Sequence, residues 1–298
     1  MSKLLAVFFD QCFEKLETPF ALLATLARIS NGKMEYQVER YSRNLYLARI
    51  SLLDPMYRSS GTSLETSPWL ALTKAHSELV ERKSTWRHEW KLPTDAVCGQ
   101  STSMFQKLAA YRAELELFER DALVNFWASG LFTKDISDHH EWKDFPKHLG
   151  LNLRLKVYVV PSHKHVVTVA LLMPFDSIFG QRILAVGCSA AKAEETAARA
   201  AVKEALMLAL NDPLDSVDSP TFGKLHDQNS SDLKNRHLCN LGLRNLTKRS
   251  GFYTTHIVYS AKLSGIRNGT PYISQESFEV LFGRIKPREP ATIPYFTK

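Results

Sequence analysis

Two glutamates one helical turn apart, Glu116 and Glu119, are the feature of this sequence that most clearly could do chemistry. They lie in a segment from Met104 to about Ser129 whose periodicity predicts a long helix, and Gly130 is placed to end that helix. Carboxylates at this spacing project from the same side of a helix. They could therefore chelate a hard cation such as Mg²⁺, which prefers oxygen ligands.

The polar residues of this helix fall into two stripes with apolar flanks when residues are placed about 100° apart around the helix axis. One stripe contains Lys107, Glu114, Asp121 and Asn125, and the other contains Arg112, Glu116, Glu119 and Arg120. Only one stripe needs to face bulk water, so the other could line a cleft that holds a cation. A half-exposed helix with an Arg112–Glu116 ion pair explains the same pattern without a ligand.

Two further helices place acidic residues where a cation could join them. Glu204 shares a face of the helix predicted from about Ala190 to Leu210 with small and apolar residues, and a carboxylate buried there needs an arginine, a metal ion or water. In the first predicted helix, residues 3 to 16, Asp10 and Glu14 stand four positions apart, and a cation between them would relieve their repulsion. An exposed edge position explains Glu204 equally well, and a solvated face is the commoner explanation for Asp10 and Glu14. The pattern alone does not establish that the three helices converge.

The elements that must position these residues alternate between helices and strands. Strands are predicted within residues 35–53, at 153–160, 166–172, 182–186 and 252–259. Residues 57–67 and the segment 212–236 are predicted to be loops, and no repeat at a fixed short period is found. The expected fold class is mixed α/β (α+β), with helices packed on mixed β-sheets in a single domain over residues 1–298.

Composition excludes several classes of protein. A hydrophobic fraction of 44% and a charged fraction of 23% are typical of folded globular chains. No apolar run approaches the ~18–20 residues that a membrane span needs. The four cysteines, Cys12, Cys98, Cys188 and Cys239, lie far apart without a CxxC pair. This spacing argues against a disulfide framework and a clustered zinc site, and it favours the reducing cytoplasm.

The stretch from Cys98-Gly-Gln-Ser-Thr-Ser through Glu116-Leu-Phe-Glu119-Arg120 to Trp127 resembles the glycine-containing turn and Glu-x-x-Glu-Arg helix of the YcaO-domain proteins. Gly187-Cys-Ser through Ala200-Ala-Val-Lys-Glu204 is similar to a later helix of that family. Gln11-Cys-Phe-Glu14-Lys15 occupies the place of the family's earlier Glu-x-x-Glu-Arg. The tail, Arg288-Glu-Pro-Ala-Thr-Ile-Pro294-Tyr-Phe296, is similar to the proline-containing C-terminus of ring-forming members, microcin-synthetase types among them.

The resemblance implies a YcaO-like fold and a site for ATP and Mg²⁺, because glutamates of these helices hold Mg²⁺ ions that bridge the ATP phosphates in the family. By position, the implied metal ligands are Glu14, Glu116, Glu119 and Glu204. The implied cofactor-binding residues are Gln11, Gly99, Arg120 and Gly187. The C-terminal tail reaches the active site in the family, so Pro294, Tyr295 and Phe296 are implied to be catalytic.

The function implied is ATP-dependent cyclodehydration, which forms azoline rings from Cys, Ser or Thr residues of a ribosomally made precursor peptide. The implied partners are that peptide, a leader-binding protein, a flavin-dependent dehydrogenase and a second copy in a homodimer. Neither nucleic acid nor a membrane is expected. Two alternatives stay open: a degenerate, non-catalytic scaffold subunit of such a complex, and an enzyme that makes another backbone modification, a thioamide or an amidine.

Some positions depart from the family pattern. Gln11 stands where the family usually has glutamate, Met207 where it often has glutamine, and Ser103 near a usual glycine. The family's upstream segment with Ser and Lys is not found before the first motif. The sequence is therefore expected to be N-terminally truncated relative to the family, which favours the scaffold alternative.

Other candidate sites are weaker. The histidines at His139, His140 and His148, and the pair His163 and His165, do not match the ligand spacing of known zinc sites. Basic groups within residues 234–249 and 284–288 match no nucleic-acid motif, and a solvated surface explains them. Cys98 and Cys188 each precede a helix without an evident histidine partner, which favours structural cysteines.

Overall fold

The computed structural model describes residues 34–42, 44–53, 58–86, 92–93, 95–103, 105–139, 141–175, 182–211, 217–218, 221–225, 241–250, 253–267, 270–283 and 285–288. The first predicted helix, residues 3 to 16, lies outside the described residues. The chain forms two compact units: residues 1–90, 102–104 and 249–253 belong to the first, and residues 91–101, 105–248 and 254–298 to the second.

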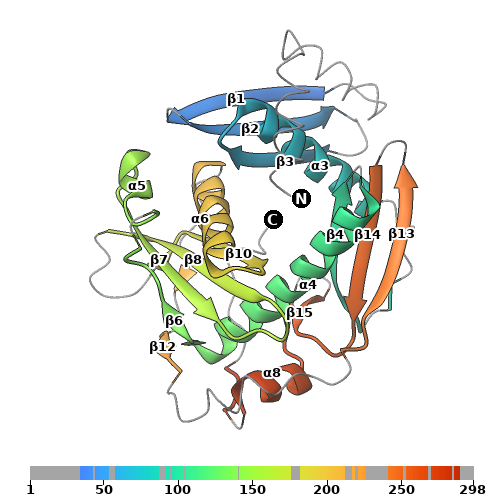
Figure 1. Ribbon diagram of the computed structural model, residues 1–298, viewed down its shortest axis with the longest axis vertical. Coiled ribbons are helices and arrows are strands. Elements are labelled where there is room, and N and C mark those ends of the chain that lie inside the picture. The colour runs from blue at the N-terminus through green and yellow to red at the C-terminus, as the bar shows by residue number, and fades with distance from the viewer. Residues whose placement is uncertain are drawn as a thin grey trace. The chain divides into compact units, whose positions relative to one another are not determined.

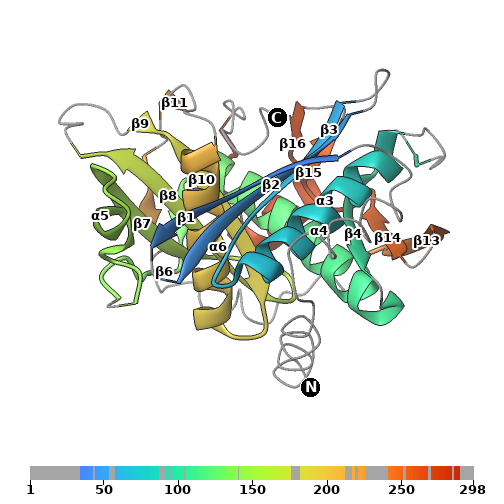
Figure 2. The same ribbon diagram turned by 90° about the horizontal axis from the view of Figure 1, so that it is seen from above.

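The first unit contains a three-stranded antiparallel sheet covered by one helix. Strands β1 (Met34–Ser42), β2 (Leu45–Leu53) and β3 (Arg58–Glu65) lie in that order, and helix α3 (Pro68–Trp86) packs on β2 and β3 (Figures 1 and 2). The strands predicted within residues 35–53 are confirmed. The prediction of a loop at residues 57–67 is wrong, because the small residues of β3 are needed where the strand lies directly against α3.

The second unit contains a four-stranded sheet and most of a three-stranded one. In one, the strand order is β10 (Ala185–Ala191), β8 (Val166–Pro174), β7 (Leu153–Val160) and β6 (Lys134–Asp135), all antiparallel. Helix α6 (Glu194–Asn211) packs on β8 and β10 (Figure 1). The predicted strands at 153–160 and 166–172 are confirmed. The predicted helix at 190–210 begins later, at Glu194, because β10 extends to Ala191.

The other sheet has the order β13 (Arg244–Ser250), β14 (Tyr253–Ser260) and β4 (Val97–Ser103), and the strand predicted at 252–259 is β14. Four short strands form two further pairs: β9 (Arg182–Ile183) with β11 (Val217–Asp218), and β5 (Leu131–Phe132), in parallel, with β12 (Gly223–Lys224). A hairpin of β15 (Gly265–Arg267) and β16 (Thr270–Tyr272) precedes helix α8 (Gln275–Phe282), and a short helix α5 (Phe145–His148) lies near β7. The predicted loop at 212–236 thus contains two short strands.

Helix α4 (Gln106–Ser129) passes between these sheets and ends at Gly130, whose φ of 70° is left-handed. One of its sides packs with residues of β8 and β10, and another packs with Val97 of β4 and Val258 of β14. The two apolar flanks expected from the sequence are therefore both covered, as is typical of a helix that is apolar on several sides. Helices packed on sheets confirm the expected fold class. None of the described helices is long and apolar enough to cross a membrane.

Candidate active site

The strand–helix pairs β3–α3, β4–α4 and β10–α6 share one local design. Each strand contains a glycine, Gly61, Gly99 or Gly187, and ends four residues after it. Each helix begins seven residues after the glycine, so the connection always has two residues. The three copies are irregularly spaced in the chain, which is why a search for a fixed period does not detect them.

The glycine of each copy lies directly under the helix backbone. A Cβ atom on Gly99 would stand 2.2 Å from the carbonyl oxygen of Ala113, and one on Gly187 would stand 1.9 Å from that of Ala201. The corresponding distance from Gly61 to the oxygen of Ala75 is 1.8 Å. Packing therefore explains why these positions are glycine. Contact of Gly99 and Gly187 with a nucleotide stays a prediction.

Seventeen residues after each glycine, a glutamate of the helix accepts a hydrogen bond from a backbone N–H of the strand in the same copy. Oε2 of Glu116 accepts a hydrogen bond from the N–H of Gln100 at 2.6 Å, and Oε2 of Glu204 accepts one from Cys188 at 2.9 Å. Glu78 accepts one from Thr62 at 2.8 Å in the same way. Among the described strands, β3, β4 and β10 lie at the edges of their sheets. The carboxylates thus satisfy outward N–H groups that no other strand in the described part of the chain bonds.

A second glutamate, one helical turn further on, reaches the next copy's strand. Oε1 of Glu119 accepts hydrogen bonds from the N–H of Ala190 at 2.8 Å and from the hydroxyl of Ser189 at 3.3 Å. Because Cys188 and Ala190 are two residues apart in β10, Glu119 and Glu204 bond to N–H groups about 7 Å apart. In the first unit Glu81 accepts from the N–H of Thr102 at 3.0 Å.

The surroundings of Glu119 and its neighbour Glu116 change the pKa of the Glu119 carboxyl. Glu119 is half-buried, and the protein around its carboxyl removes that group from water and raises its pKa to about 7, with a further rise caused by the neighbouring charge of Glu116. Arg120 forms an ion pair with Glu116 and donates to the carbonyl oxygen of Cys98 at 3.0 Å. Arg120 therefore balances Glu116 and holds it against β4.

The two cysteines beside these carboxylates are poor nucleophiles. Burial raises the pKa of the Cys98 thiol. Burial and the charges of Glu119 and Glu204 raise the pKa of the Cys188 thiol well above its usual value. Both are free thiols that stay protonated near neutral pH, which agrees with a structural role.

The donor set fits Mg²⁺ held jointly by protein and phosphate. Glu116, Glu119 and Glu204 offer hard carboxylate oxygens, and a cation would offset the buried charge of Glu119. Within the described ranges, no three acidic, histidine or cysteine side chains converge closely enough to hold an ion by themselves. Mg²⁺ commonly takes only one or two carboxylates and completes its octahedron with phosphate and water.

The structure thus brings four of the predicted residues, Glu116, Glu119, Arg120 and Glu204, to the edges of β4 and β10. The others on which the prediction depends, Gln11, Glu14 and the tail residues Pro294, Tyr295 and Phe296, lie outside the described residues. A second Glu-x-x-Glu-Arg sequence, Glu78-Leu-Val-Glu81-Arg82, was not singled out from the sequence. The sequence does contain a signal for this motif, because the spacing from Gly61 to Glu78 repeats the spacing from Gly99 to Glu116.

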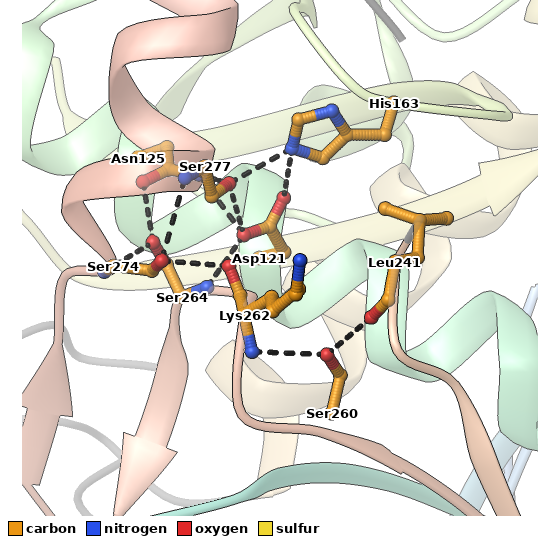
Figure 3. Close-up of polar contacts among 9 residues, drawn as sticks. All are labelled: Asp121, Asn125, His163, Leu241, Ser260, Lys262, Ser264, Ser274 and Ser277. Carbon is orange, nitrogen blue, oxygen red and sulfur yellow. Dashed lines mark hydrogen bonds and ion pairs between the residues drawn. The ribbon is translucent and has the colours of Figure 1, made fainter. Parts of the chain in front are cut away.

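Two residues of the other polar stripe of α4, Asp121 and Asn125, are buried in a hydrogen-bond network (Figure 3). Oδ1 of Asp121 accepts from the hydroxyl of Ser277 at 2.8 Å and from the N–H of Ser264 at 2.7 Å. Ser277 Oγ also lies 2.9 Å from Nε2 of His163 and 3.1 Å from the amide nitrogen of Asn125. Since its one proton goes to Asp121, the Ser277 hydroxyl accepts from both of these groups, which places a proton on Nε2 of His163.

This network has a structural rather than a catalytic geometry. Asp121 and Ser277 are fully buried, and the serine proton points to the carboxylate instead of to the histidine. Ser264 and Ser274 extend the network to the turn before β15 and to the N-cap residue of α8. The network therefore ties the second half of α4 to the hairpin and to α8.

Comparison with known proteins identifies the family. Residues 106–262 match a family model described as YcaO cyclodehydratase, ATP- and Mg²⁺-binding. The chain belongs to the YcaO family, and ATP and Mg²⁺, expected from the sequence, are the cofactors of that family. Among curated proteins, none matches the sequence significantly.

Solved structures show the same fold at low identity. YcaO from Methanopyrus kandleri bound with AMPPCP and Mg²⁺ superposes with a TM-score of 0.60 at 15% identity, over 80% of this chain and 88% of that one. The E. coli microcin synthetase McbBCD complex gives 0.53 at 12% identity, over 79% and 89%. The same complex with pro-MccB17 bound gives 0.55 at 11% identity, over 88% and 96%.

Proposed function

We propose that this protein is an ATP- and Mg²⁺-dependent enzyme that forms azoline rings from Cys, Ser or Thr residues of a ribosomally made precursor peptide. Family membership supports this class of chemistry. The observation that carries it to this chain is the placement of Glu119 and Glu204 on the N–H groups of Ala190 and Cys188, two residues apart on β10. Two carboxylates held in this way offer oxygen ligands to a hard cation.

Each residue has a defined role in this proposal. Glu116, Glu119 and Glu204 would hold Mg²⁺, and the N–H groups of Gln100, Ala190 and Cys188 fix the directions of their carboxylates. When bound, ATP with Mg²⁺ would supply the phosphoryl group that lets a peptide amide oxygen depart as phosphate. Gly99, Gly187, Gln11 and Arg120 remain proposed contacts of the nucleotide, and Glu14 a proposed metal ligand.

The C-terminal tail is proposed to complete the site through Pro294, Tyr295 and Phe296. The backbone N–H of Arg288 donates to the carbonyl oxygen of Ala128 at 2.9 Å, so the tail departs from the C-terminal end of α4. Glu119 lies nine residues before Ala128, about 14 Å along the helix axis. The ten residues that follow Arg288 span up to about 33 Å when extended. The tail is therefore long enough to reach Glu119.

We further propose that the enzyme works in the cytoplasm with partner proteins: one that binds the leader of the precursor peptide, a flavin-dependent dehydrogenase, and a second copy of the chain. The similar fold of a subunit in the E. coli microcin synthetase complexes supports assembly with other proteins. Another backbone modification, such as thioamide or amidine formation, would use the same activation of an amide oxygen and is distinguished by the mass of the product.

A non-catalytic scaffold is the second candidate, and one observation favours it. Met207 in α6 takes the position that Glu81 and Glu119 hold in the other two copies, so the third copy lacks its second carboxylate. A scaffold would keep the hydrogen bonds of the glutamates to the strand edges without binding nucleotide. The two candidates therefore differ in one measurable property.

Calorimetry with a non-hydrolysable ATP analogue, with and without Mg²⁺, tests the proposal. We expect Mg²⁺-dependent binding that Glu116→Gln, Glu119→Gln or Glu204→Gln each abolishes. Glu195→Gln, an exposed position on the same helix as Glu204, should bind as the unchanged protein does. Absence of binding to the unchanged, folded protein would support the scaffold instead. Ring formation is then tested by mass spectrometry, as loss of water from a peptide with Cys, Ser and Thr.

A further inference from the structure

A serine stands two residues after the glycine in each of the three strand–helix copies, and the serine of the third copy contacts the proposed metal site. The three sequences are Gly61-Thr-Ser63, Gly99-Gln-Ser101 and Gly187-Cys-Ser189. A small side chain suits a position beside a glycine that lies under a helix. Packing alone does not use the hydroxyl group, whereas the hydroxyl of Ser189 donates a hydrogen bond to Oε1 of Glu119 at 3.3 Å.

The two faces of β10 are covered by different helices, α4 and α6 (Figure 1). Cys188 and Ala190 belong to the apolar cluster that includes residues of α4, so their side chains lie on the α4 face. Gly187 lies under Ala201 of α6. Because side chains alternate between the two faces of a strand, the side chain of Ser189 shares the α6 face with Gly187.

Glu119 therefore meets groups from both faces at the edge of β10. Its side chain comes from α4, and its Oε1 accepts from the outward N–H of Ala190 at 2.8 Å. The hydroxyl of Ser189 reaches the same oxygen from the α6 face. Glu204 comes from α6, and it bonds to the N–H of Cys188, two residues before Ala190. Ser189 thus draws the Glu119 carboxylate towards the face of the strand that is covered by the helix of Glu204.

The second oxygen of the Glu119 carboxylate is left for a ligand. Both donors, Ala190 and Ser189, use Oε1, and no described residue donates a hydrogen bond to Oε2. Two donors on one oxygen fix the carboxylate more narrowly than one, because rotation of the group would disturb both hydrogen bonds. Oε2 therefore keeps a constant direction, which suits Mg²⁺ because this ion demands near-ideal octahedral geometry.

We propose that Ser189 is a positioning residue of the metal site, whose hydroxyl orients the Glu119 carboxylate so that its Oε2 is presented to Mg²⁺. This inference rests on the proposed function, in which Glu119 and Glu204 hold the cation. Ser189 acts through Glu119 and needs no contact of its own with the cation or the nucleotide. The N–H of Ala190 is the backbone part of the same support, and the hydroxyl of Ser189 is the part that a substitution can remove.

Exchange of backbone amide hydrogens with solvent tests the positioning in the absence of metal and nucleotide. The N–H of Ala190 is bonded by Glu119, and that of Cys188 by Glu204. We expect Ser189→Ala to speed exchange at Ala190 about tenfold, as the loss of a hydrogen bond to a charged group would, and to leave exchange at Cys188 unchanged. Ser189→Thr keeps a hydroxyl and should restore the slow exchange. Nuclear magnetic resonance measures the two amides separately.

The Mg²⁺ requirement of nucleotide binding tests the consequence for the site. At a fixed concentration of a non-hydrolysable ATP analogue, we expect Ser189→Ala to need about tenfold more Mg²⁺ for half-maximal binding. Ser189→Thr should need the same Mg²⁺ concentration as the unchanged protein. Ser63→Ala, at the same position of the first copy, is the matched control, because Ser63 belongs to β3 and not to the strand that Glu119 bonds. Circular dichroism and thermal unfolding establish that the variants are folded.

Three results would overturn the proposal. An unchanged Mg²⁺ requirement in folded Ser189→Ala would show that the hydroxyl does not serve the site, and unchanged exchange at Ala190 would show that it does not hold the carboxylate. Equal impairment of Ser189→Ala and Ser189→Thr would assign the role to side-chain size. Failure of the proposed function gives a different result: the unchanged protein would not bind the nucleotide with Mg²⁺, although exchange at Ala190 would still respond to Ser189→Ala.

Discussion

Glu119 extends from the middle of α4 to β10, where its Oε1 accepts the N–H of Ala190 at 2.8 Å. The hydrogen bond needs only an acceptor, whereas burial penalises the negative charge that the acceptor carries. The two roles of this side chain, support of a strand edge and provision of a negative charge, can therefore be separated by substitution.

Glu119→Gln keeps an oxygen acceptor for Ala190 and removes the buried charge. We expect the metal-free variant to unfold a few degrees higher than the unchanged protein at pH 8. We also expect it to lose ATP turnover and the rise in melting temperature that Mg²⁺ and nucleotide give the unchanged protein. Differential scanning fluorimetry and an ATPase assay measure these effects, with Glu195→Gln as the control. A lower melting temperature with full turnover would show a purely structural role.

The stability of the metal-free protein should fall as pH rises from about 4 to about 7. Burial raises the pKa of the Glu119 carboxyl from 4.5 to about 7, and burial raises that of Asp121 from 3.8 to about 7. The folded state therefore binds more protons than the unfolded state in this window, and stability is lost as pH passes through the folded pKa. The Glu119 share is on the order of 3 kcal/mol.

Urea unfolding at pH 5 and pH 8 in the presence of a chelator measures this difference. Glu119→Gln should reduce it, because the substituted side chain does not titrate. Greater stability at pH 8 than at pH 5 for the unchanged protein, with no change in Glu119→Gln, would contradict the prediction.

Alanine at Gly187 should destabilise the protein, because its Cβ would stand 1.9 Å from the carbonyl oxygen of Ala201. Relief requires α6 to move away from β10, at a cost of about 1–3 kcal/mol or more. The displacement also moves Glu204, so nucleotide binding should weaken. Gly223→Ala is the matched control, because its nearest contact would be 4.0 Å away. Urea unfolding compares the two variants, and equal stabilities would refute the packing account.

Ser277→Ala should cost about 1–3 kcal/mol, because it leaves buried polar groups of Asp121, His163 and Asn125 without the serine hydroxyl. Ser60→Ala, at an exposed position of β3, serves as the control. Chemical unfolding of both variants measures the difference. A Ser277→Ala variant as stable as Ser60→Ala would show that the network does not hold α8 to α4.

Deletion of residues 290–298 should abolish ring formation while nucleotide binding largely survives. The tail begins at the end of α4 remote from the glutamates, so its loss leaves their hydrogen bonds to β4 and β10 in place. Mass spectrometry of the peptide product and calorimetry of nucleotide binding are measured on the same preparation. A shortened protein that modifies peptide at full rate would remove Pro294, Tyr295 and Phe296 from the catalytic assignment.

The sequence predicted helices α4 and α6 and the apolar strands because their periodicity depends on local residues, whereas helix α3 was not predicted. Helix α4 and strands β7 and β8 have strong patterns of this kind. Strand β3 was missed because Gly61 and its small polar neighbours are typical of a loop. They are required instead by contact with α3, a tertiary feature that local propensity does not report.

The candidate site could be predicted only in part, because side-chain patterns mark its glutamates but not their partners. The acidic stripe of α4 pointed to Glu116 and Glu119, and the small-residue face of α6 pointed to Glu204. Their partners, the N–H groups of edge strands, are backbone atoms that every residue carries, so no side-chain pattern marks them. The network of Asp121 was equally hidden, since Ser264 and Ser277 are more than 100 positions away in the chain.

The two-residue connection and the contact between glycine and helix give each strand–helix copy the same local geometry. Residues 113–120 of α4 correspond one for one to residues 201–208 of α6, because both sets begin at the alanine that rests on the glycine. A segment transplanted between these helices would arrive in register and carry its acidic side chains with it. Exchange of these helix segments would therefore change the number of carboxylates along the strand edges without any change to the sheets.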